Sequence, residues 1–191
     1  MRNQLIKLMP QTDLATYNNS WFRPGGNPLK RALWYYINIL FVKGSLFPFS
    51  GFKVFWLRLF GSSIGANVTI KPGVNIKYPW NLTIGNNVWL GENVWIDCLV
   101  QVTIGNNVCI SQGAVILTGS HNYKKTTFDL IVTDVVLEAG VWIGACAIVN
   151  AGVTAGTHAV LTSGSVATKN LEAYTIYQGN PAVKTRLRGI E

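Results

Sequence analysis

The chain has 191 residues, of which 49% are hydrophobic and 13% are charged, and its formal net charge is +8. This composition excludes a largely disordered chain and fits one domain with an N-terminal appendage. The positive charge favours an anionic partner such as a phosphate group or a membrane surface. The basic residues gather at the two ends of the chain. Because the middle of the chain is nearly neutral, a nucleic-acid groove along the body is not expected.

The cysteines and the apolar segments indicate in which cellular compartment the protein is expected. The chain has three cysteines, at Cys98, Cys109 and Cys146, with no CxxC or Cys/His ligand spacing. Because the number is odd and the spacing fits no ligand set, neither a disulfide framework nor a metal site is expected. The first residues lack the apolar region of a signal peptide. The longest apolar stretch, residues 32–42, is too short to span a bilayer. These features favour a cytoplasmic protein with reduced thiols.

Residues 1–62 form the N-terminal segment, in which two helices are expected. Asn27 and Pro28 are typical of a helix start, and an apolar helix is predicted over residues 29–43. A second, short amphipathic helix is predicted over residues 51–60. Two roles remain open for this segment. It can cap the end of the domain that follows, or it can contact the inner face of the membrane peripherally, because aromatic and basic residues together suit the interface.

From residue 63 the sequence repeats. Similar hexads begin at Ser63, Thr83 and Thr103. A period of six fits neither a helix nor a long half-buried strand, but it fits very short strands separated by turns, where Gly and Asn suit the backbone. Each strand would place one aliphatic residue inward, at Ile64, Ile70, Ile76, Ile84, Leu90, Ile96, Ile104, Ile110, Ile116, Leu137, Ile143, Val149, Ala155, Leu161 and Ala167.

Three such strands close one triangular coil of about 18 residues, which predicts a parallel β-helix of hexapeptide repeats over residues 63–172. The spacing of 20 residues implies two extra residues at a corner, near Asn81–Leu82 and Gln101–Val102. The wider gap between Ile116 and Leu137 predicts a protruding loop over residues 120–134, and residues 173–191 form a C-terminal tail. The alternative is a β-sandwich with regularly spaced turns. It is disfavoured because so many consecutive hexads keep the same six-residue register.

Several motifs then carry a resemblance to a known family. They are G-S-H at 119–121, G-V-W-I-G-A at 140–145, S-V-A-T-K-N-L at 165–171, G-N-P-A-V at 179–183, L-K-R-A-L-W-Y-Y-I-N at 29–38 and I-K-Y-P-W-N-L-T-I-G at 76–85. Residues 17–188 resemble the hexapeptide-repeat acyltransferases, and most of all the colanic-acid-biosynthesis type, which is related to galactoside and maltose O-acetyltransferases. The resemblance implies a left-handed β-helix, a homotrimer with sites in the clefts between subunits, and acetyl-CoA as the donor.

The resemblance also assigns roles near the loop. His121 corresponds to the general base that takes a proton from the acceptor hydroxyl, and an imidazole suits this role because it titrates near neutrality. Asp97 can orient His121 or bind a sugar hydroxyl of the acceptor, or it can be a hydrated turn carboxylate, and Asn122 is a candidate for binding the acceptor. Cys98 stands where the family usually has Asn, which puts an oxyanion role of that side chain in doubt, and Asn122 replaces the usual Asp. The second histidine, His158, is expected in an ordinary turn facing solvent.

By the same resemblance, Trp142 and Ala145 line the pantetheine channel of coenzyme A, Ser163 and Thr168 contact it, and Lys169 and Arg186 face its phosphates. The expected activity is O-acetylation of a saccharide or sugar-lipid acceptor in surface polysaccharide assembly. Two alternatives stay open. The acceptor could be another hydroxyl compound, such as serine or an antibiotic, or the chain could be a catalytically silent scaffold.

Overall fold

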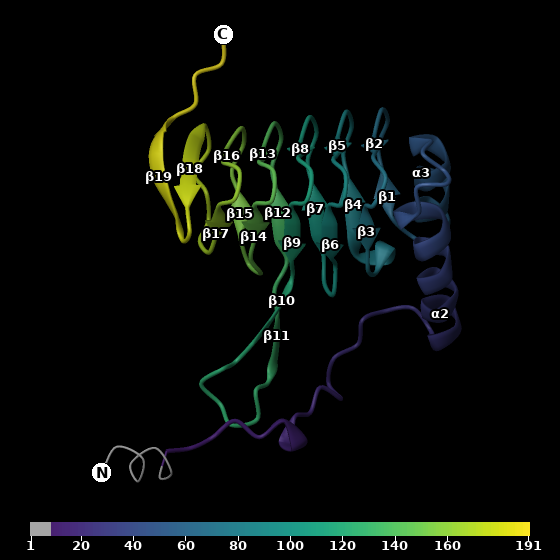
Figure 1. The fold of residues 1–191 in the computed structure, drawn as a ribbon, viewed down its shortest axis with the longest axis vertical. Coiled ribbons are helices and arrows are strands. Elements are labelled where there is room, and N and C mark those ends of the chain that lie inside the picture. The colour runs from purple at the N-terminus through teal and green to yellow at the C-terminus, as the bar shows by residue number, and fades with distance from the viewer. Residues whose placement is uncertain (1–8) are drawn as a thin grey trace. The chain divides into compact units, whose positions relative to one another are not determined.

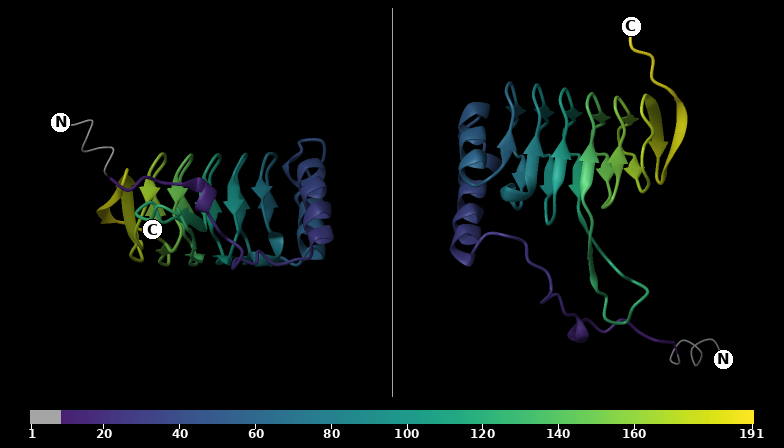
Figure 2. Two further views of the ribbon diagram at one scale, coloured as in Figure 1. Left: turned by 90° about the horizontal axis from the view of Figure 1, so that it is seen from below. Right: turned by 180° about the vertical axis from the view of Figure 1, so that it is seen from behind.

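The computed structural model describes residues 9–191. The described chain divides into two compact units. The smaller unit consists of residues 9–23 and 120–131, and the larger unit consists of residues 24–119 and 132–191. The larger unit contains the repeats, which are wound as successive coils of a β-solenoid behind two helices (Figures 1 and 2).

Three ladders form the faces of the solenoid and confirm the predicted fold, and all their pairings are parallel except that of the last two strands, β18 and β19, which is antiparallel. The first face holds β1 (Ser63–Ile64), β4 (Leu82–Ile84), β7 (Val102–Ile104), β12 (Val135–Leu137) and β15 (Thr154–Ala155). The second holds β2 (Thr69–Ile70), β5 (Trp89–Leu90), β8 (Cys109–Ile110), β13 (Trp142–Ile143), β16 (Val160–Leu161), β18 (Thr175–Gly179) and β19 (Ala182–Leu187). The third holds β3 (Asn75–Ile76), β6 (Trp95–Asp97), β9 (Val115–Leu117), β14 (Ile148–Val149) and β17 (Val166–Ala167).

The predicted inward positions pair with one another from coil to coil. Ile64 pairs with Ile84 and Ile84 with Ile104 on the first face, and Leu90 pairs with Ile110 on the second. All the predicted inward residues are buried. Burying an aliphatic side chain contributes about 1.5–3 kcal/mol. The six-residue period therefore describes the core of the solenoid directly.

The recurring I-G-x-N-V pattern has a steric origin. A Cβ on Gly65 would lie 2.7 Å from the backbone carbon of Gly85, and a Cβ on Gly105 would lie 2.8 Å from the backbone nitrogen of Ala139. Only glycine allows the coils to approach this closely. Asn87, at the following turn, has a φ of 57°, a left-handed backbone that Asn tolerates better than most residues.

The corners that hold the extra residues lie slightly before the predicted places. The 3-10 helix η3 (Pro79–Asn81) occupies the first corner, and Leu82 already belongs to β4. Residues 98–101 make the second corner, and Val102 already belongs to β7. The extra residues at each corner thus end immediately before the next strand, whose first residue already packs into the core.

The N-terminal helices cover the first coil. They are α2 (Pro28–Ile37), the π-helix η2 (Asn38–Lys43) and α3 (Ser50–Leu59). As predicted, Asn27 caps α2, because its Oδ1 accepts a hydrogen bond from the backbone N–H of Lys30 (2.8 Å). The single helix predicted over residues 29–43 is instead divided at Asn38, where the wider π turn begins. At that point the side chain of Asn38 donates to Asn75 Oδ1 (2.7 Å).

Side chains of these helices satisfy the open edge of the solenoid. Trp34 Nε1 donates to the carbonyl of Ile76 (2.9 Å), and Lys53 Nζ donates to the carbonyl of Lys71 (3.0 Å). Arg58 donates to the carbonyl of Ile64 (2.7 Å). An uncovered edge would leave these groups free to pair with another chain. Within residues 9–191, no helix has both the length and the apolar character needed to cross a membrane.

The ladder is interrupted where the gap in the repeats predicts. After β9 the chain forms β10 (Gly119–His121) and β11 (Leu130–Val132), which pair only with each other. The chain rejoins the first face at Val135, the predicted residue. At the root of this excursion, the N–H of Thr133 donates to the carbonyl of Thr118 (2.9 Å). The tip of the excursion contributes to the smaller unit, in which the N–H of Asp13 donates to the carbonyl of Thr126 (2.8 Å).

Candidate active site

His121 is held in one orientation by contacts within the smaller unit. Its Nδ1 lies 3.0 Å from the backbone carbonyl of Phe128. Its ring stacks on the ring of Phe128, with centroids 4.4 Å apart and an interplanar angle of 8°. The ring of Tyr17 lies 5.8 Å away on a tilted plane. A carbonyl oxygen only accepts hydrogen bonds, so Nδ1 carries the proton in the neutral ring and Nε2 keeps a free lone pair.

Phe128 presents its carbonyl from an unusual backbone conformation. Its φ is 50°, and a bulky residue rarely adopts the left-handed region unless its surroundings impose it. The N–H of Phe128 donates to the carbonyl of Lys125 (3.1 Å), which closes a tight turn before the strand. The loop therefore holds Phe128 in a conformation in which its ring stacks on His121 and its carbonyl accepts a hydrogen bond from Nδ1 of His121.

Polar contacts within the loop hold this turn. The carboxylate of Asp129 accepts from Lys125 Nζ (2.8 Å) and from Thr127 Oγ1 (2.6 Å). These hydrogen bonds lower the pKa of Asp129, because they favour the charged carboxylate. Asn122, a predicted acceptor-binding residue, uses its Oδ1 to accept from the N–H of Lys124 (3.2 Å). The side chain of Asn122 thus forms a local Asx turn.

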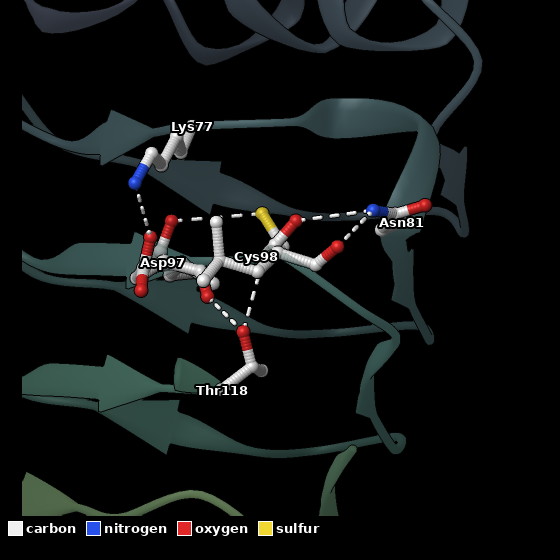
Figure 3. A network of polar contacts seen from close by, with 7 residues as sticks. Lys77, Asn81, Asp97, Cys98 and Thr118 are labelled. Atoms are coloured by element: carbon white, nitrogen blue, oxygen red, sulfur yellow. Dashed lines mark hydrogen bonds and ion pairs between the residues drawn. The ribbon is translucent and has the colours of Figure 1, made fainter. Parts of the chain in front are cut away.

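Asp97 is the last residue of β6, just before the second corner of the solenoid, and belongs to the network shown in Figure 3. Its side chain is buried, and Lys77 Nζ lies 3.2 Å from Oδ1. Thr118 Oγ1 donates to the carbonyl of Asp97 and accepts from the N–H of Leu99 (2.9 Å). Asn81 Nδ2 donates to the carbonyl of Leu99 (2.9 Å). Asp97 is therefore a fixed, ion-paired carboxylate rather than a hydrated turn residue.

Cys98 points into the core beside Asp97. It is fully buried, and its Sγ lies 3.5 Å from the carbonyl of Ile96. Burial raises the pKa of the Cys98 thiol to about 12, because the apolar surroundings disfavour a thiolate. The thiol is thus a neutral core group, in agreement with the doubt about an oxyanion role at this position.

Four of the six residues predicted to contact coenzyme A lie along one side of the larger unit. Two of the four, Trp142 and Arg186, lie on one row of the second face, because Trp142 pairs with Val160, Val160 with Ile176, and Ile176 with Arg186. The row from Trp142 to Arg186 spans three strand spacings, or about 14 Å. Trp142 is exposed, and its Nε1 donates to Ser111 Oγ (3.0 Å).

Ala145 and Ser163 lie at the corner next to this row, in consecutive coils. The carbonyl of Ala145 accepts from the N–H of Gly164 (2.8 Å), which brings the two turns into contact. Thr168 and Lys169 follow β17 and are exposed at a different corner. An extended molecule such as coenzyme A can follow the row from Trp142 to Arg186, whereas Lys169 lies off that line.

His158 differs from the solvent-facing turn residue that was expected. It does occupy a turn, with a φ of 57°, but its ring packs on Tyr174 with centroids 4.9 Å apart. Its Nδ1 is buried, and a Cβ on Gly140 would lie 2.1 Å from that atom. The ring fills the space that Gly140 leaves between successive coils.

Comparisons with known proteins agree with this architecture. The chain matches no protein-family model. It is 38% identical over 164 residues to WcaF of Escherichia coli K12, which is named as an acetyltransferase of colanic acid biosynthesis, covering 86% of this chain and 90% of WcaF. It is 30% identical over 123 residues to the galactoside O-acetyltransferase of the same organism, covering 63% of this chain and 61% of that protein.

A hexapeptide-repeat acetyltransferase of Vibrio cholerae, solved in complex with acetyl coenzyme A, has the same fold. Its TM-score is 0.76 at 23% sequence identity, covering 85% of this chain and 88% of that chain. From the fold and the extended identity to WcaF, the chain belongs to the hexapeptide-repeat acetyltransferases, a family of acetyl-CoA-dependent enzymes.

Several residues of the site were not predicted from the sequence. Phe128 and Tyr17 carry no motif that points to His121. Lys77 could have been found, because it precedes Asp97 by the same 20 residues that separate consecutive coils. The ladder indeed pairs Ile76 with Ile96, one position earlier.

Proposed function

We propose that the protein transfers an acetyl group from acetyl-CoA to a hydroxyl of a saccharide, in the assembly of a surface polysaccharide. The observation that carries this proposal is the orientation of His121 in a chain of this family. Its Nδ1 faces the carbonyl of Phe128 at 3.0 Å, so the free lone pair is on Nε2. The similarity to WcaF over nearly its whole length supports the choice of a saccharide.

Acetyl-CoA supplies the acetyl thioester. Nε2 of His121 accepts the proton of the acceptor hydroxyl as the hydroxyl oxygen bonds to the acetyl carbon, and the protonated ring then gives that proton to the sulfur that leaves. Phe128 stabilises the protonated ring, because its carbonyl keeps accepting from Nδ1. A positioned base of this kind contributes about 10²–10⁴-fold to the rate.

The donor is proposed to lie along the outward row from Trp142 to Arg186. The exposed indole offers an apolar surface for the pantetheine chain, and the guanidinium suits a phosphate because it can donate two parallel hydrogen bonds. Ala145 and Ser163 border this row. Asp97 and Asn122 are proposed to contact the acceptor, with Asp97 held in place by Lys77.

The enzyme is proposed to act as a homotrimer with its sites in the clefts between subunits. Support comes from the third face of the solenoid, whose outward positions include Val115, Ile148 and Val166. These apolar residues are half-buried in the single chain, and a neighbouring subunit would cover them. Analytical ultracentrifugation should give a trimer, and a monomer that turns over acetyl-CoA would contradict the proposal.

The activity is tested by thiol release from acetyl-CoA with a panel of acceptors. The panel contains free sugars, nucleotide sugars, lipid-linked sugars, serine and chloramphenicol. We expect thiol release to depend on a saccharide. Release with serine or chloramphenicol alone would assign another acceptor class. An absence of release with every acceptor, from protein that binds coenzyme A, would point to a silent scaffold.

A further inference from the structure

The outer side of the N-terminal helices is apolar, although it faces away from the core. In α2 the buried side chains are Trp34 and Ile37. The opposite side of the helix is also apolar, and α3 repeats the pattern. The outer cap surface consists of Leu29, Leu33, Tyr36, Leu40, Phe55 and Leu59, each more than half exposed. Apolar side chains on a helix surface are normally covered by a neighbour.

Half of these residues meet across the two helices. A groove of about 510 Å³ is lined from α2 by Leu29, Leu33 and Ile37, and from α3 by Trp56 and Leu59. The groove thus joins apolar side chains of the two helices, with Asn27 and Lys30 also in its lining. A group of exposed apolar side chains on a folded domain generally marks an interaction site.

The charges around the outer cap surface are all positive. Residues 14–91 contain no Asp or Glu. Lys30 lies beside α3 and the first corner, with its Nζ 5.0 Å from the centre of the Trp80 ring, and Arg31 and Lys43 line a second hollow with Tyr35. Each of these cations lies at the flank of the apolar face, where a long side chain can reach a phosphate at the level of lipid headgroups.

We propose that the outer cap surface docks on an anionic lipid bilayer. The apolar side chains enter the boundary between headgroups and acyl chains, and the flanking cations contact lipid phosphates. A second copy of the chain is a poorer occupant, because it would bring the same cations together with no carboxylate to oppose them. Because the helices close one end of the solenoid (Figure 2), the coils then follow one another away from the membrane.

This inference is independent of the acetyl transfer, and flotation with lipid vesicles tests it. The full chain is mixed with phosphatidylcholine vesicles, with or without phosphatidylglycerol. We expect binding to the anionic vesicles only. Arg31→Gln with Lys43→Gln should weaken binding about 30-fold, from about 1 kcal/mol per charge. Leu40→Ser with Phe55→Ser should weaken it on the order of 30-fold.

The matched control replaces exposed apolar residues at the other end of the solenoid. Val183→Ser with Leu187→Ser, on β19, should leave vesicle binding unchanged. Thermal unfolding of every variant checks that the fold is kept. No binding to anionic vesicles, equal binding to neutral vesicles, or equal loss in the control would overturn the proposal. If the chain does not bind vesicles but self-associates, and Leu40→Ser with Phe55→Ser abolishes this self-association, the surface would be assigned to contact with a second copy of the chain.

Discussion

Gly144→Ala should destabilise the solenoid, because the coils are in contact at this position. A Cβ on Gly144 would lie 2.4 Å from the backbone nitrogen of Ser163 and 2.7 Å from the carbonyl carbon of Thr162. The shorter distance is 1.0 Å below the 3.4 Å of an ordinary contact, and the neighbour is backbone. Overpacking of this kind costs about 1–3 kcal/mol. For a chain of this size the melting temperature should fall by about 2–12 °C.

Gly51→Ala is the matched control, since it makes the same substitution in open space. No atom lies within 4 Å of a Cβ at Gly51, which is exposed in α3. Alanine should stabilise this helix by about 0.5–1 kcal/mol. Differential scanning calorimetry of both variants measures the two shifts. Gly144→Ala melting at or above the temperature of the unmodified chain would refute the close approach of the coils.

Three further outcomes follow from the packing and charges. Ile110→Ala should lower the free energy of unfolding by about 2–5 kcal/mol in urea titrations, because the side chain is fully buried. Burial lowers the pKa of Lys53 in the folded chain. At pH values between this lowered pKa and the ordinary pKa of lysine, the unfolded chain binds more protons than the folded chain. The free energy of unfolding therefore rises with pH in that range. Lys53→Met should remove this rise in urea titrations at successive pH values, and an unchanged slope would contradict the burial. Arg186→Ala, on the proposed donor row, should weaken coenzyme A binding in calorimetry, by less at high salt, whereas Lys71→Gln should not; equal loss in both would refute the assignment.

The repeat domain could be predicted from the sequence because its period is local. Each inward aliphatic lies six residues from the next, so the register of Ile84 with Ile104 is already present in the spacing. In the same way, the wider gap after Ile116 predicted where the chain leaves the solenoid and where it rejoins it. The division of the first helix at Asn38 could not be predicted, because the structure pairs Asn38 with Asn75 in the first coil.

The site was predicted less completely, since its geometry depends on contacts between segments distant in sequence. The motif G-S-H identified His121, but nothing in the sequence indicates that Phe128 adopts a positive φ and presents its carbonyl to the ring. His158 was placed correctly in a turn. Its packing against Tyr174 and Gly140 depends on how three successive coils stack at that corner.

The most direct test of the proposed mechanism is the turnover of His121→Ala with the best saccharide acceptor. Turnover should fall by about two to four orders of magnitude, while coenzyme A affinity is kept, because the row from Trp142 to Arg186 is unchanged. His158→Asn, which suits the positive φ of that turn, should turn over at nearly the normal rate. Near-normal turnover of His121→Ala would show that His121 is not the base.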